Sequence, residues 1–293
     1  MTSTHDQIFS ADPLRPYVFC GASFPQRSVP HAAIRGASLA LGASMFEKGI
    51  IGHVGVDFVS FYDEFNRRQR LWAVDLNIGM TRSGNSFTMC DFLMQGNVET
   101  STGEYMVQPL SITELPSALS AGGGGATASD QSSEFFSVDG SSAGGSRSQQ
   151  SDVASSKAND TRETRSYVAI DCLYHPNLGA MQYGAFFNLC RLHGVSFDLQ
   201  QRTGTAFMLT DSLAAGIVGL IGVGSGEDGS QAAMKTVSKA LRFIESQVGS
   251  MRSQGEFDSE KSNFPEISAT VKALVQAAES GGGAEGAVNK GGR

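Results

Sequence analysis

Residues 112–165, in the middle of the chain, consist largely of Ser, Gly, Ala and Asp and contain almost no aliphatic side chains. Such a segment cannot bury enough apolar surface to offset the conformational entropy lost when its backbone is ordered. We therefore predict a disordered insertion here, with folded material on both sides of it, in residues 1–111 and 166–249. The second block resumes with strand-forming residues 167–174, too few to found an independent domain, so both blocks are predicted to build one folded unit.

Residues 250–293 are again rich in Gly and Ser and are predicted to be a disordered tail. One part of this tail has a different pattern. After Pro265, the side chains of Ile267, Val271 and Leu274 recur at helical spacing, which predicts a short helix that docks on the folded unit.

Hydrophobic periodicity predicts an α+β fold: an antiparallel sheet with helices packed on one face. In the first block it predicts strands at 4–9, 51–62 and 71–78 and helices at 30–48 and 83–94. In the second block it predicts strands at 167–174, 195–199, 205–210 and 216–223, and a helix through residues 178–192. The clearest helix carries Met234, Val237, Leu241, Ile244 and Val248, at steps of three and four residues.

Charge and composition exclude several classes of function. The net charge of −7 gives no global basic field to hold nucleic acid. The four cysteines are too far apart in sequence to suggest a zinc site, and no apolar run is long enough to cross a membrane. A cytoplasmic protein without nucleic-acid or membrane partners is the expectation.

The candidate metal-binding residues lie in the pair of predicted strands at 51–62 and 71–78. Because side chains alternate along a strand, Asp75 and Asn77 share a face, and Asp57 lies on the neighbouring strand. Two carboxylates and an amide oxygen suit a hard cation such as Mg²⁺, which takes few protein ligands. From spacing alone, an ordinary solvated sheet face is an equal alternative.

These strands carry the pattern G-V-D-F-V at 55–59 and W-A-V-D-L-N at 72–77, which resembles the metal-binding hairpin of ATP-grasp enzymes. The run T-H-D-Q-I at 4–8, followed by Tyr17, Gly21 and Phe24-Pro25, is similar to the branch of the family that contains IQ motif-containing protein H and pheganomycin-type peptide ligases. The resemblance implies the C-terminal lobe of an ATP-grasp domain, with Asp57, Asp75 and Asn77 holding Mg²⁺ on ATP.

The same resemblance implies an ATP-dependent ligase reaction, in which a carboxylate is activated as an acyl phosphate and joined to an amine or thiol. It also implies an incomplete site, because the family pattern begins at about residue 2 and leaves no room for the N-terminal lobe, which would have to be supplied separately. Catalytic residues are not assigned. Gly55 and Gly79 occupy positions where many members have an arginine, and Arg70 or Arg82 are the candidates to replace it. Asp75 replaces the commoner Glu.

The alternative function is a non-catalytic interaction module that binds other proteins. The resemblance to this branch of the family implies a cilium or flagellum as the location of such partners. A second glycine run, G-L-I-G-V-G-S-G at 219–226, lies between a predicted strand and helix as a dinucleotide-binding loop would. Its G-x-G-x-G spacing departs from that fingerprint, and a tight strand–helix turn is the favoured interpretation.

Overall fold

The computed structural model describes residues 1–108, 162–209, 213–250 and 262–280. The predicted disordered insertion at 112–165 lies outside this part except at its end, where residues 163–165 already belong to a strand. Most of the predicted tail at 250–293 also lies outside it. Both predictions of disorder therefore remain predictions.

An antiparallel sheet forms the core, in the order β1-β2-β7-β10-β9-β8. Its strands are β1 (Asp6–Phe9), β2 (Phe19–Phe24), β7 (Glu163–Tyr174), β10 (Ile217–Ser225), β9 (Thr203–Met208) and β8 (Phe197–Asp198). Two short strands, β5 (Asn97–Val98) and β6 (Tyr105–Val107), pair with each other, and β6 also pairs with β7. The insertion at 112–165 thus separates strands that pair, as the sequence predicts for a single unit.

Strands β7 and β10 are central because both of their faces are apolar. Val168 and Ile170 of β7 point to one face of the sheet, and Tyr167 and Ala169 point to the other; all four are buried. This near-continuous apolar run is what a strand covered on both sides requires.

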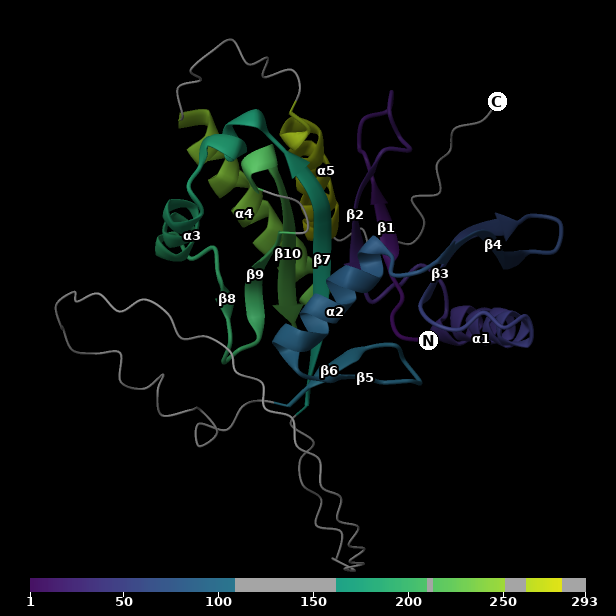
Figure 1. The fold of residues 1–293 in the computed structure, drawn as a ribbon. Helices are drawn as coiled ribbons and strands as arrows, with labels where there is room; N and C mark the ends of the chain where they lie inside the picture. Colours follow the sequence, from purple (N-terminus) through teal and green to yellow (C-terminus); the bar gives the residue numbers. More distant parts are fainter. Residues whose placement is uncertain (109–161, 210–212, 251–261, 281–293) are drawn as a thin grey trace, which may run out of the picture. The chain divides into compact units, whose positions relative to one another are not determined.

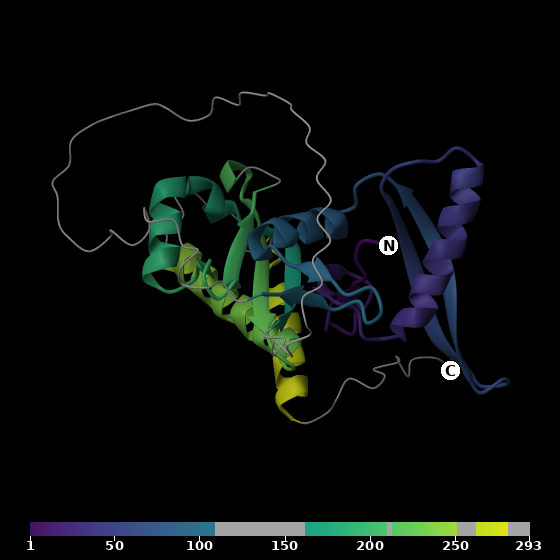
Figure 2. The same cartoon turned by 90° about the horizontal axis from the view of Figure 1, so that it is seen from below.

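Helices cover both faces of the sheet, as Figure 2 shows. On one face lie α3 (Tyr183–Leu192), α4 (Gly229–Ser250) and α5 (Phe264–Glu279), together with the 3₁₀ turns Pro176–Ala180 and Leu213–Ala215. On the other face lies α2 (Arg82–Met94), through Phe87, Cys90 and Met94. The α+β class and the antiparallel sheet are confirmed; the placement of all helices on one face is corrected, because these three α2 side chains need the second face for their burial.

The helix predicted after Pro265 is α5. Its Ile267 and Val271 are buried in the same core as α4, and Phe264 joins them. None of the helices in the described ranges is both long and apolar enough to span a lipid bilayer.

The remaining elements are α1 (His31–Glu47), β3 (Val54–Asp63) and β4 (Arg68–Ile78). β3 and β4 form a separate two-stranded antiparallel sheet, and α1 lies along this hairpin in Figure 1 and Figure 2. No residue of α1 is fully buried, and even the apolar stripe of this helix is only partly buried: Ile34, Ala37, Leu41 and Met45. The hairpin and α1 therefore have no core comparable to that of the large sheet.

Candidate functional site

The register of the β3–β4 hairpin brings the two predicted acids together. Asp57 lies directly opposite Asp75, and Gly55 lies directly opposite Asn77. Directly opposed residues of an antiparallel pair, and residues two apart in one strand, project to the same face. Asp57, Asp75 and Asn77 therefore share one face of the hairpin.

A β-bulge begins immediately beside this pair. Phe58 is opposite Ala73, so Val74 is the extra residue that has no cross-strand partner. The bulge adds one residue to β4, so beyond it the alternation shifts and Trp72 lies on the same face as the two acids. Phe61 of β3 lies on that face too, and its ring centroid is 4.6 Å from that of Trp72. The face thus combines an acidic end with an aromatic end.

Asp57 is half-buried, and burial raises the pKa of its carboxyl group, with a further rise from the neighbouring charge of Asp75. Two carboxylates held this close repel each other, and a divalent cation between them would remove that repulsion. The electrostatics of the pair therefore favour cation binding.

Asn77 is oriented by Asp75. Its amide nitrogen donates a hydrogen bond to Oδ2 of Asp75 at 3.1 Å, and the other carboxylate oxygen, Oδ1, accepts from the backbone N–H of Leu76 at 2.9 Å. Because the amide nitrogen is engaged, the amide oxygen of Asn77 is left to act as a ligand.

Gly55 leaves room for the chain that follows β4. A Cβ atom at Gly55 would come within 2.4 Å of the Cγ2 methyl group of Thr81. Thr81 is the N-cap of α2, and its hydroxyl accepts a hydrogen bond from the backbone N–H of Gly84 at 3.1 Å. A larger side chain at position 55 would therefore meet the residue that caps α2.

The two candidate arginines contact groups other than Asp57 and Asp75. Arg70 forms an ion pair with Asp63 at 3.1 Å, near the turn of the hairpin. Arg82 donates to Sγ of Cys172 at 3.0 Å, and its charge opposes the rise that burial causes in the pKa of Asp171. The suggestion that Arg70 or Arg82 serves the site stays a prediction.

One contact of the site was missed by sequence reasoning. The amide nitrogen of Gln7 on β1 donates to Oδ1 of Asp57 at 3.3 Å, and so joins the large sheet to the hairpin. Gln7 belongs to the T-H-D-Q run, but nothing local in that run indicates a partner fifty residues away.

The donor set fits Mg²⁺ in type. All three groups offer oxygen, and Mg²⁺ commonly binds one or two carboxylates and completes its shell with water or phosphate oxygens. Within the described ranges, no three His, Cys, Asp or Glu side chains cluster to hold a metal. A cation here would therefore rely on two carboxylates, one amide and oxygens from its ligand.

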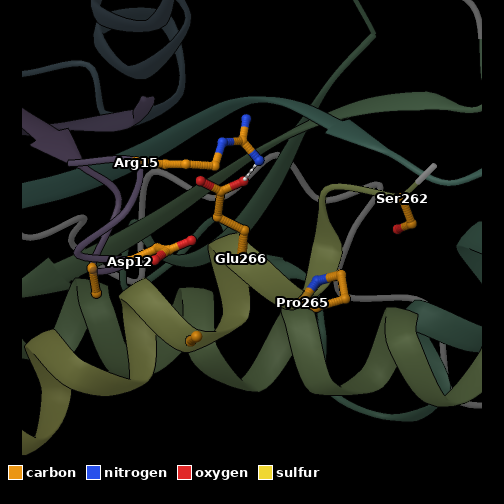
Figure 3. A pocket seen from close by; sticks show the side chains of 7 residues that line it. Asp12, Arg15, Ser262, Pro265 and Glu266 are labelled. Carbon is orange, nitrogen blue, oxygen red and sulfur yellow. Dashed lines mark hydrogen bonds and ion pairs between the residues drawn. The ribbon is translucent and has the colours of Figure 1, made fainter. Parts of the chain in front are cut away.

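A separate pocket of about 410 Å³ lies between the loop after β1 and the start of α5 (Figure 3). Arg15 extends over it and forms an ion pair with Glu266 at 3.0 Å, with Asp12 and Pro265 nearby. The cation of Arg15 is engaged by Glu266, so the pocket offers a ligand little uncompensated charge.

Glycines of the run at 219–226 allow close packing of β10 against α4. A Cβ at Gly224 would lie 2.2 Å from the carbonyl oxygen of Gly229 and 2.6 Å from the backbone nitrogen of Ala233, both in α4. The glycines let β10 and α4 approach closely, which agrees with the predicted tight strand–helix turn.

Comparison with known proteins places the hairpin in a family context. Residues 1–101 match the family model described as "IQCH-like, ATP-grasp". IQ motif-containing protein H of Danio rerio is 23% identical over 257 residues, which is 87% of this chain and 19% of that protein. The chain thus spans about a fifth of the length of this relative. No solved structure matches.

Proposed function

Since this chain carries an IQCH-like ATP-grasp segment that includes the whole β3–β4 hairpin, we propose that it provides a Mg²⁺-binding lobe for ATP. Asp57, Asp75 and Asn77 hold the cation in this proposal. The bound cation supplies positive charge to phosphate oxygens. The observation that carries the proposal is the direct cross-strand pairing of Asp57 with Asp75, with Asn77 on the same face.

The role of the protein residues follows from their geometry. Asp57 and Asp75 provide negative charge from two strands whose relative position is fixed by the hairpin ladder. Asn77 adds a neutral oxygen, oriented through its hydrogen bond to Asp75. A lobe of this kind holds and orients the phosphates, and ligase-type carboxylate activation in addition needs residues that are not assigned in this chain.

A titration of the full chain with Mn²⁺, a substitute for Mg²⁺ with an electron-paramagnetic signal, tests the proposal. We expect saturable binding at one class of site that is abolished in Asp57→Asn and in Asp75→Asn, since each change removes a charged ligand. Asp228→Asn is the matched control, because Asp228 is exposed just before α4 and far from the hairpin in sequence. Equal binding by the wild type, Asp57→Asn and Asp228→Asn would reject the cation site.

A non-catalytic interaction module is the second candidate, favoured by the apolar surface of the same segment. Large side chains of β4 are exposed, with Trp72 at 62%, Val74 at 56% and Ile78 at 66%, and Phe46 of α1 is exposed at 70%. Large apolar patches on a protein surface commonly mark protein–protein contact sites, and these exposed side chains are the candidates for such a patch on either face of the hairpin. If the wild type binds no Mn²⁺, this second function becomes the better account of the hairpin.

A further inference from the structure

The segment before and within β1 is held by tertiary contacts along its length. The backbone carbonyl of Thr4 accepts from the backbone N–H of Gln26 at 3.1 Å. Oδ2 of Asp6 accepts from the backbone N–H of Arg27 at 2.6 Å. Three consecutive residues, Thr4, His5 and Asp6, thus each bond to a distant part of the chain, His5 through Tyr167.

His5 fixes the direction of the neighbouring side chains. Its Nε2 lies 2.7 Å from the hydroxyl of Tyr167, and its ring packs against Phe24 at 5.6 Å between centroids. Both partners belong to the core on the α2 face of the sheet. Because side chains two apart share a face, Gln7 is also directed to the α2 side.

The side chain of Gln7 reaches the candidate site, since its amide nitrogen donates to Oδ1 of Asp57 at 3.3 Å. An amide donor engages one carboxylate oxygen without adding charge, and it leaves Oδ2 of Asp57 to face a cation. A hydrogen bond of this kind restricts the rotation of a metal-binding carboxylate.

We propose that Gln7 is a positioning residue of the cation site, which holds the Asp57 carboxylate in its binding orientation from the rigid β1 strand. This inference rests on the proposed function, because it requires that Asp57 binds a cation. It assigns a role to the T-H-D-Q run beyond resemblance: His5 and Asp6 hold the strand, and Gln7 connects it to the site.

Two substitutions at Gln7 separate positioning from a general structural role. Gln7→Leu removes the donor at similar size, and we expect Mn²⁺ affinity to fall by about tenfold, the lower end of the effect of losing an outer-shell partner. Gln7→Glu also lacks the N–H donor but places a third carboxylate beside Asp57, so its added negative charge should offset part of the loss and Mn²⁺ should bind more tightly than in Gln7→Leu. A residue that only supports the fold would lower the affinity only together with the melting temperature.

The experiment uses the full chain, with Mn²⁺ titrations followed by electron paramagnetic resonance and with melting temperatures recorded for each variant. Gln69→Leu is the matched control, because Gln69 is an exposed glutamine on β4 that donates to the backbone carbonyl of Ser28 at 3.0 Å, away from the acids in register. It should bind Mn²⁺ as the wild type does.

The outcomes distinguish this inference from the proposed function. If Asp57→Asn binds Mn²⁺ as well as the wild type, the cation site itself is rejected. If Asp57→Asn loses binding but Gln7→Leu keeps wild-type affinity, or if Gln7→Leu loses affinity only together with melting temperature, the positioning role is rejected while the site stands. Weaker binding in Gln7→Leu at an unchanged melting temperature, with tighter binding in Gln7→Glu than in Gln7→Leu, supports it.

Discussion

His5 is buried as a neutral base. Burial lowers the pKa of its imidazole to about 4, from an ordinary value of 6.5. In the tautomer that carries its proton on Nδ1, its Nε2 accepts a hydrogen bond from the Tyr167 hydroxyl, which stays protonated because burial raises the pKa of Tyr167. A protonated ring could not accept this bond and would place a charge beside Phe24.

This arrangement predicts acid sensitivity. Because the pKa of His5 is depressed in the folded state, the unfolded chain binds more protons below pH 6.5, so the stability from His5 is full above that value and is lost as the pH falls toward 4. The loss is at most about 3 kcal/mol.

Chemical denaturation between pH 7.5 and pH 4.5 measures the effect. His5→Gln keeps an acceptor for the Tyr167 hydroxyl but does not titrate, so its stability should fall less over the same range. The variant also separates His5 from Asp57 and Asp171, whose pKa values are raised and whose contributions to stability change in the opposite direction. Parallel curves for wild type and variant would contradict the assignment.

Gly55 gives a second prediction at the residue scale. Gly55→Ala places a methyl group 2.4 Å from Cγ2 of Thr81, which cannot rotate away without losing its cap on α2. We expect a loss of about 1–2 kcal/mol in the free energy of unfolding, typical of overpacking. Thr81→Ser removes the methyl group but keeps the capping hydroxyl.

The double variant Gly55→Ala/Thr81→Ser should therefore recover most of that loss, and thermal or chemical denaturation of all four proteins gives the coupling energy. Additive effects of the two changes would show that the methyl groups do not meet.

At the scale of elements, strong hydrophobic periodicity correctly predicts helices and strands. The steps of three and four residues through α4, and the β-branched and aromatic runs of β3, β7 and β10, all correspond to helices and strands in the structure. These elements bury a regular stripe or an apolar run, so their pattern is written locally in the sequence.

The elements that were missed depend on distant partners. β2, with sequence F-C-G-A-S-F, has no clear alternation, and its Gly21 is needed because a Cβ there would lie 2.3 Å from the carbonyl oxygen of Ala169 on β7. The short strand β6 pairs with β7, which lies more than fifty residues later in the chain, and β5 pairs with β6. For the site, the pairing of Asp57 with Asp75 was predictable from the hairpin, whereas the contact with Gln7 links two sheets and has no local signal.

The start of α5 is fastened to the end of β7 by Asn263. Its Oδ1 accepts from the backbone N–H of Tyr174 at 2.8 Å, and its Nδ2 donates to the carbonyl oxygen of Cys172 at 2.6 Å. Asn263→Ala leaves both backbone groups without these partners, so we expect a loss of about 2 kcal/mol in the free energy of unfolding.

Ser280→Ala, at the exposed end of α5, is the matched control and should change stability by less than about 0.5 kcal/mol. Denaturation curves for both variants make the comparison. If Asn263→Ala is as stable as the control, α5 does not depend on this attachment, and the burial of Phe264 and Ile267 alone accounts for its docking.

At the scale of the whole molecule, the described chain combines a well-buried sheet with a hairpin that is largely exposed. The large sheet has an apolar core on each face, whereas β4 has no buried residue along its length. The candidate site lies on the second of these parts. Gln7 on β1 is hydrogen-bonded to Asp57, one of the two acids of this candidate site.

This arrangement predicts how the chain binds nucleotide. Asp57 and Asp75 make an anionic face, which attracts divalent cations and repels free ATP. On the proposed function, Asp57, Asp75 and Asn77 would reach the phosphates through the cation, and these three residues offer the adenine and ribose no contact. We expect this chain alone to bind Mg²⁺ weakly, with a dissociation constant on the order of millimolar, and Mg-ATP no more tightly.

Isothermal titration of the chain with MgCl₂ and with Mg-ATP checks this expectation, with Asp75→Asn as the variant that lacks one ligand. Heat from Mg²⁺ binding should disappear in Asp75→Asn, and no phosphate should be released from ATP by either protein. Micromolar affinity of the wild type for Mg-ATP would contradict the prediction, because it would require adenine and phosphate contacts from residues of this chain other than the three at the hairpin.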